Sequence, residues 1–142
     1  MKIVIVDDEP KIRNGLSKLL SSRPGFEIIG VFENAMEALE QLSVSYADVI
    51  ITDIKMPEIN GLDLINRIRE KDENTKIIIL SGYSDFSFAQ RAIELGVTRY
   101  LTKPTNAREL IGILEEIEKN IQKPRSEEKQ EMKVTNLFVQ KA

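Results

Sequence analysis

Residues 1–12, MKIVIVDDEPKI, place three acidic residues directly after a run of four β-branched apolar residues. An apolar run this short is typical of a strand that is buried on both faces of a sheet and opens into solvent at its end. Like charges about 4 Å apart repel by roughly 4 kcal/mol at an effective dielectric near 20. The carboxylates of Asp7, Asp8 and Glu9 therefore suggest that a cation neutralises them.

A structural role explains part of this cluster. An acidic residue directly before Pro10 suits the start of a helix, because proline is favoured in the first turn and negative charge is favourable at the positive end of the helix dipole. We therefore expect a helix cap at this point. A cap needs one carboxylate, whereas the segment has three.

Short apolar runs recur along the chain, and each is followed by a segment with helical spacing. The five pairs are KIVIV (2–6) with PKIRNGLSKLLSS (10–22), FEIIGVF (26–32) with NAMEALEQLS (34–43), DVIIT (48–52) with GLDLINRIREK (61–71), KIIIL (76–80) with SDFSFAQRAIEL (84–95), and TRYL (98–101) with NARELIGILEEIEKNI (106–121). Such alternation predicts parallel strands joined by right-handed crossovers. We predict an α/β fold with a five-stranded, doubly wound parallel sheet, and we expect ligands beyond the carboxyl ends of its strands.

Length and composition exclude several classes of protein. With 142 residues, the chain is long enough for one well-buried core and too short for two ordinary domains. Its net charge of -3 gives no general attraction to nucleic acid or to anionic membranes, so we expect neither as a partner of this chain alone. Without cysteine or histidine, it has no disulfide, thiolate or imidazole chemistry. The short apolar runs and the lack of a signal peptide predict a cytoplasmic protein.

Polar residues follow four of the predicted strands. Asp7 and Asp8 follow the first strand, Asp53 the third, Ser81 the fourth and Lys103 the fifth. Each alone has a structural explanation as a helix cap, a turn residue or a solvated surface residue. Together they bring three carboxylates, a hydroxyl and an ammonium to one edge of the sheet, which favours a hard divalent cation. We predict that Mg²⁺ binds at this edge and keeps a coordination position open for phosphate.

Four segments carry a resemblance to a known family: VDDEP (6–10), DVIITDIKMPEINGLDL (48–64), IIILSG (77–82) and YLTKP (100–104). With these motifs in this order, residues 2–121 resemble the receiver domain of two-component response regulators. The resemblance implies a flavodoxin-like fold with five helices and the strand order 2-1-3-4-5. It also implies a protein that catalyses its own phosphorylation and dephosphorylation rather than a conventional enzyme.

The resemblance further implies a role for each residue at the strand ends. Asp53 matches the phosphoryl acceptor. The magnesium ligands would be the carboxylates of Asp7, Asp8 and Asp53 together with the backbone carbonyl of Lys55. Ser81 and Lys103 match the hydroxyl and the ammonium that bind the phosphoryl oxygens.

Four residues receive further expectations, Tyr100 and Pro104 from the resemblance and Lys55 and Tyr83 from their places two residues beyond Asp53 and Ser81. Tyr100 matches the aromatic residue that turns inward when Ser81 moves toward the phosphoryl group. The peptide bond before Pro104 is expected to be cis. The side chains of Lys55 and Tyr83 are expected to flank the path of the water that hydrolyses the phosphate.

The implied partner is a sensor histidine kinase, whose phosphohistidine supplies the phosphoryl group. A homodimer through the fourth helix, fifth strand and fifth helix is also implied. Segment 80–104, LSGYSDFSFAQRAIELGVTRYLTKP, is similar to receivers that precede AraC-type helix-turn-helix output domains. We expect a receiver domain in residues 1–122 and a linker or tail toward a missing output domain in residues 123–142, with transcriptional control as the output.

Four alternatives remain beside this prediction. The chain could be a natural single-domain receiver that acts by docking onto another protein, or a receiver that works without phosphorylation. Haloacid-dehalogenase-type phosphatases have a similar residue set, but their nucleophile lies in a DxD motif after the first strand, where this chain has adjacent aspartates. A flavodoxin-type module would need a phosphate-binding loop rich in Ser, Thr and Gly after that strand, and DDEP is not one.

Overall fold

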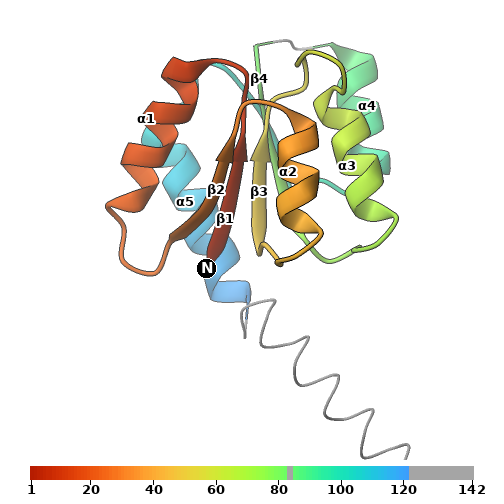
Figure 1. Cartoon of the computed structure of the whole chain (residues 1–142). Coiled ribbons are helices and arrows are strands. Elements are labelled where there is room, and N and C mark those ends of the chain that lie inside the picture. The colour runs from red at the N-terminus through yellow and green to blue at the C-terminus, as the bar shows by residue number, and fades with distance from the viewer. Residues whose placement is uncertain (83–84, 122–142) are drawn as a thin grey trace, which may run out of the picture.

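The computed structural model describes residues 1–82 and 85–121, and strands and helices alternate along them (Figure 1). The strands are β1 (Lys2–Val6), β2 (Glu27–Phe32), β3 (Val49–Thr52), β4 (Lys76–Ser81) and β5 (Arg99–Thr102). The helices are α1 (Pro10–Ser21), α2 (Ala35–Leu42), α3 (Gly61–Arg69), α4 (Phe86–Glu94) and α5 (Ala107–Asn120). The predicted linker, residues 123–142, lies outside the described residues.

The sheet is parallel and its strand order is β2-β1-β3-β4-β5, which confirms the prediction. From β1 the chain first moves outward to β2 and then crosses over to β3 on the other side of β1. The strand order therefore reverses between β1 and β3, where Val6 lies opposite Thr52. In open α/β sheets this reversal opens a crevice beyond the carboxyl ends of the strands.

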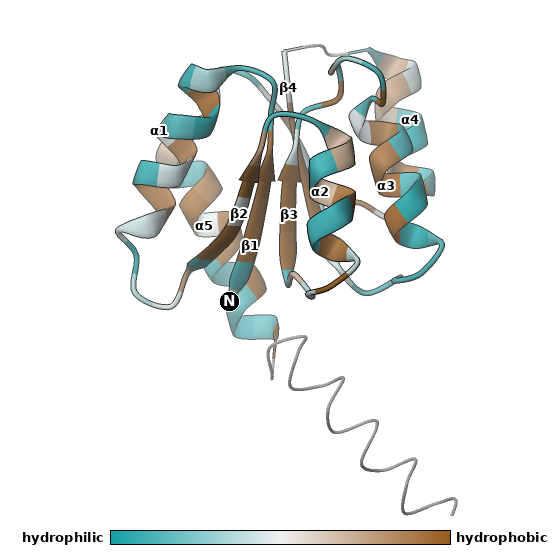
Figure 2. Cartoon of the chain, viewed as in Figure 1, coloured by the Kyte–Doolittle hydropathy of each residue, from teal (hydrophilic) through white to brown (hydrophobic). Residues whose placement is uncertain are grey.

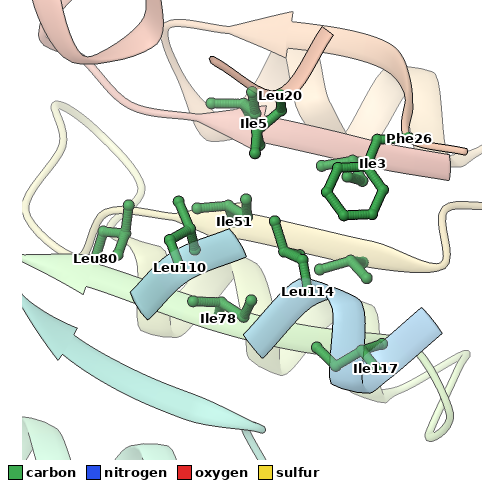
Figure 3. Close-up of a cluster of buried hydrophobic side chains, with 11 residues drawn as sticks. Ile3, Ile5, Leu20, Phe26, Ile51, Ile78, Leu80, Leu110, Leu114 and Ile117 are labelled. Carbon is green, nitrogen blue, oxygen red and sulfur yellow. The ribbon is translucent and has the colours of Figure 1, made fainter. Parts of the chain in front are cut away.

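Helices cover both faces of the sheet. Figure 1 shows α1 and α5 on one side and α2, α3 and α4 on the other. The central strands are apolar except at their ends, and the helices turn apolar stripes toward them (Figure 2), because a strand buried on both faces has no polar side. In the cluster of Figure 3, Leu110, Leu114 and Ile117 of α5 pack on Ile51 and Ile78 of the sheet.

Helix α4 buries few of its side chains. Ala92 is the one fully buried residue among its described positions, while the side chains of Phe86 and Ile93 are 80% and 77% exposed. Its carboxyl end is nevertheless fixed by Arg69 of α3, whose Nε donates a hydrogen bond of 2.8 Å to the carbonyl of Leu95. Within the described part of the chain, every helix is too short or too polar to cross a membrane.

A close backbone contact fixes the loop between β3 and α3. The Gly61 N–H donates a hydrogen bond of 2.6 Å to the carbonyl of Ile54. A Cβ atom at position 61 would lie 1.9 Å from the carbonyl oxygen of Asp53, which is backbone and cannot turn aside. Only glycine therefore permits this approach of α3 to the end of β3.

We expect Gly61→Ala to lower the free energy of unfolding by about 1–3 kcal/mol, because the added methyl group overpacks against backbone. Gly15→Ala is the matched control. A Cβ at Gly15, inside α1, meets nothing within 4 Å, so alanine there should raise stability by up to about 1 kcal/mol. Urea unfolding followed by circular dichroism measures both, and equal effects of the two changes would contradict the close-contact argument.

Candidate functional site

The sheet itself brings the polar strand-end residues together. The Asp53 N–H donates a hydrogen bond of 3.0 Å to the carbonyl of Val6, and the Lys103 N–H donates one of 2.7 Å to the carbonyl of Ser81. Both bonds continue the parallel ladder just past the last paired residues. Asp7, Asp53 and Lys103 thus leave three different strands at one edge, as predicted.

The ammonium of Lys103 lies among three carboxylates. Its Nζ is 2.9 Å from Asp7 Oδ2, 3.1 Å from Asp53 Oδ2 and 3.1 Å from Glu9 Oε1, and its side chain is 13% exposed. An ammonium has three N–H donors, so these acceptors use all of them. Burial alone would lower the pKa of Lys103, but the hydrogen bonds to Asp7, Glu9 and Asp53 outweigh it and raise the pKa above its ordinary value.

Asp53 is 5% exposed and uses both carboxylate oxygens. Oδ1 accepts a hydrogen bond of 2.7 Å from the Ile54 N–H, and Oδ2 accepts one of 3.1 Å from Lys103. Burial raises the pKa of Asp53, and the charge of Asp7 adds to the rise. The hydrogen bond and charge of Lys103 lower the pKa but do not cancel the effect of burial.

Four carboxylates form one acidic cluster. Asp7, Asp8, Glu9 and Asp53 each offer an oxygen, and these oxygens all lie within 4.8 Å of one another. The single ammonium of Lys103 cannot balance four negative charges. Oxygen donors from carboxylates, with Asp8 and Glu9 open to solvent, fit Mg²⁺, which prefers such ligands and retains several waters.

Lys55 lies two residues beyond Asp53, in the loop before α3. Its side chain is exposed, and its ammonium is 5.9 Å from the centre of the Phe88 ring on α4. That distance permits a cation–π contact. The predicted ligand role of its backbone carbonyl stays a prediction, and Tyr83, the other residue expected beside the water path, lies outside the described residues.

Ser81 and Tyr100 are in contact across β4 and β5. Ser81 is fully buried, Tyr100 is half-buried, and their side chains are hydrogen-bonded to each other. Burial raises the pKa of the Tyr100 hydroxyl, while the hydrogen bond with Ser81 opposes that rise. Tyr100 also packs against the cluster that contains Ala92 of α4. The peptide bond between Lys103 and Pro104 is cis.

The predicted helix cap lies at the expected residue, but the side chain of that residue does not cap the helix. Glu9 occupies the N-cap of α1 with Pro10 next to it, but its side chain makes no capping hydrogen bond. The side chain reaches Lys103 instead, and its backbone N–H donates a hydrogen bond of 2.9 Å to Asp7 Oδ1. The sequence pattern alone cannot show this, because the partner lies 94 residues away.

Two further residues support the site without having been predicted. Arg13 of α1 donates a hydrogen bond of 2.8 Å from Nη1 to the carbonyl of Asp7. Gly61 admits α3 against the carbonyl of Asp53. Arg13 carries no sequence signal for this role, whereas the NG pair at the start of a helical segment was a signal for Gly61.

Comparison with known proteins identifies the family of the chain. The family model of the response regulator receiver domain matches residues 3–115. The chain belongs to the response regulator receiver domain family. Receiver domains bind Mg²⁺ through acidic residues and interact with histidine kinases and phosphotransfer partners.

Among curated relatives of this receiver domain are two transcriptional regulatory proteins. YesN of Bacillus subtilis is 37% identical over 117 residues, which cover 82% of this chain and 32% of YesN. HptR of Staphylococcus aureus is 40% identical over 114 residues, which cover 80% of this chain and 44% of HptR. The chain therefore spans less than half the length of these relatives. That the relatives are transcriptional regulators agrees with the predicted class of protein, and an AraC-type output domain stays a prediction.

Solved receiver domains have the same fold. The receiver domain of AraT, a response regulator from Geobacillus stearothermophilus, is 36% identical with a TM-score of 0.73, and the match covers 84% of this chain and 93% of that one. The response regulatory domain of MrkE from Klebsiella pneumoniae is 28% identical with a TM-score of 0.78, covering 84% and 97% of the two chains. These likenesses confirm the flavodoxin-like α/β fold.

Lys103→Met should raise the pKa of Asp53 further, because Lys103 supplies the hydrogen bond and the positive charge that oppose burial. The NMR chemical shift of the Asp53 carboxyl carbon, followed against pH in metal-free buffer, measures this pKa. A carboxyl group with a raised pKa stabilises the folded state at low pH, and that stability is lost as the pH rises through the folded pKa. The variant should therefore lose more stability than the wild type between acid and neutral pH.

Lys55→Met is the matched control for Lys103→Met. Its ammonium lies over Phe88 and is not among the groups that shift the pKa of Asp53. An unchanged or lower pKa of Asp53 in Lys103→Met would contradict the assigned contact.

Proposed function

We propose that Asp53 accepts a phosphoryl group from the phosphohistidine of a sensor histidine kinase in a magnesium-dependent step, and that the new charge switches an output surface for transcriptional control. The observation that carries this proposal is the contact of the buried Asp53 carboxylate with Lys103, inside a four-carboxylate cluster where the strand order reverses. Membership of the receiver family supports it.

The chemistry is a transfer between two nucleophiles. An oxygen of the Asp53 carboxylate attacks phosphorus in line with the departing nitrogen. The phosphorus–nitrogen bond breaks, its electron pair stays with the imidazole, and an acyl phosphate forms on Asp53. Positioning and charge neutralisation supply most of the catalysis of such a transfer.

Three carboxylates and one carbonyl would hold the magnesium ion: those of Asp7, Asp8 and Asp53, and that of Lys55. When bound, the ion neutralises charge on the phosphoryl oxygens, which four carboxylates would otherwise repel. Lys103 donates to one phosphoryl oxygen, since its ammonium already lies 3.1 Å from Asp53 Oδ2. Ser81, at the end of the neighbouring strand, donates its hydroxyl to another.

The hydrogen bond between Ser81 and Tyr100 supports a route from the phosphate to the surface. A phosphoryl group adds close to two negative charges and three strong acceptors. When the Ser81 hydroxyl turns to such an acceptor, its bond with Tyr100 changes, and Tyr100 packs on the cluster that contains Ala92 of α4. On the face formed by α4, β5 and α5, the exposed Phe86 and Ile93 of α4 supply apolar side chains through which two receivers can pair.

The greater length of the relatives also supports the proposed division of the chain, with a receiver domain in residues 1–122. YesN and HptR extend well beyond the matched region. We therefore assign residues 123–142 to a link toward a DNA-binding output domain, with the receiver as the regulated input. Nucleic acid is then contacted by the output domain and not by this surface.

Intact mass spectrometry after incubation with Mg²⁺ and acetyl phosphate tests the acceptor. We expect the wild type to gain one phosphate and Asp53→Asn to gain none, because the amide is not a nucleophile toward phosphorus. Asp63→Asn, at an exposed position in the first turn of α3, should gain phosphate like the wild type. A phosphorylated Asp53→Asn protein would place the acceptor elsewhere.

Asp8→Asn tests the magnesium site. Losing one direct carboxylate ligand should weaken Mg²⁺ binding by about tenfold or more, since even indirect partners of metal ligands cost about 10–100-fold. Titration calorimetry with Mg²⁺ alone measures the dissociation constant, and Asp63→Asn again serves as the control. Equal affinity of Asp8→Asn and the wild type would remove Asp8 from the ligand set.

A further inference from the structure

The side chain of Glu9 has an unusual position for a helix N-cap. Its backbone carbonyl accepts hydrogen bonds of 3.1 Å from the N–H groups of Ile12 and Arg13, as an N-cap should. Its carboxylate leaves the helix and contacts Lys103 at 3.1 Å, while the side chain remains 58% exposed. The contact therefore forms in place of a local capping bond.

The three acceptors of Lys103 are not equivalent. Asp7 and Asp53 are buried, and a buried carboxylate that loses its partner carries a large desolvation cost. Glu9 is exposed, and water can replace the lost contact at little cost. Of the three, Glu9 is the acceptor that Lys103 can give up most easily.

Phosphorylation of Asp53 adds hydrogen-bond acceptors around the Lys103 ammonium. The phosphoryl group brings new anionic acceptors to an ammonium whose three donors are already in use. For Lys103 to bind a phosphoryl oxygen during the transfer, while Asp53 is still a carboxylate, one existing contact has to open. The exposed contact with Glu9 is the one that opens.

We infer that Glu9 is a positioning residue that holds Lys103 before phosphorylation and competes with the phosphoryl oxygens for its ammonium, so that it slows phosphoryl transfer to Asp53. This inference rests on the proposed function and extends it to a residue outside the predicted set. Glu9 also lies within the acidic cluster, so rates are compared at Mg²⁺ concentrations that saturate each variant.

Two variants separate the contact from the charge. Glu9→Gln keeps the length of the side chain and removes its charge. Glu9→Asp keeps the charge and is one methylene shorter, which breaks the contact with Lys103. Both should raise the rate of phosphorylation by acetyl phosphate about two- to fivefold, the size of effect that exposed ion pairs have.

Glu33→Gln is the matched control. Glu33 is exposed, follows β2 at the same edge of the sheet, and is not among the partners of Lys103. Its variant changes the net charge equally and should react at the rate of the wild type. An acceleration in Glu33→Gln equal to that in Glu9→Gln, with none in Glu9→Asp, would assign the effect to general charge and overturn the inference.

A second measurement does not depend on phosphorylation. In metal-free protein, both Glu9 variants should shift the NMR signal of the Lys103 ammonium, whereas Glu33→Gln should leave it in place. A wild type that gains phosphate, with Glu9 variants of unchanged rate and unchanged Lys103 signal, overturns the role of Glu9 and leaves the proposed function standing. A wild type that gains no phosphate overturns the proposed function itself.

Discussion

The whole site depends on one ammonium that meets carboxylates from two other strands. Lys103 follows β5, yet its Nζ lies within 3.1 Å of both Asp7 and Asp53, which follow β1 and β3. The contact is possible because a parallel sheet ends all its strands at one edge, with the register fixed by the backbone ladder. It is necessary because two buried carboxylates side by side repel strongly in a medium that screens poorly.

The positive charge of Lys103 compensates the carboxylates only in part. One ammonium meets four clustered carboxylates, and burial keeps the pKa of Asp53 raised in spite of Lys103. A group held in an unfavourable charge state gains more from a bound cation than a well-solvated one does. The apolar core between the sheet and α5 supplies the stability that such an arrangement costs (Figure 3).

The sequence predicts the sheet and the strand-end residues because both follow from periodic patterns that act locally. Buried parallel strands have to be apolar throughout, and polar residues after them have to lie at one edge. The contact between Glu9 and Lys103 was beyond such reasoning, since the local preference was for a helix cap. The exposure of Phe86 and Ile93 also could not be predicted, because a helical stripe does not show which of its residues the sheet fails to cover.

Helix α4 is held mainly at its two ends. Its far end is held by Arg69, whose guanidinium binds the carbonyls of Leu95 and Gly96 at 2.8 and 3.1 Å. Its near end meets the site through Lys55, whose ammonium lies over Phe88. With little buried side-chain surface between these two ends, α4 resists displacement less than α3 or α5, which bury three or more residues each. If Asp53 is phosphorylated as proposed, we therefore expect α4 to shift more readily than α3 or α5, together with its exposed Phe86.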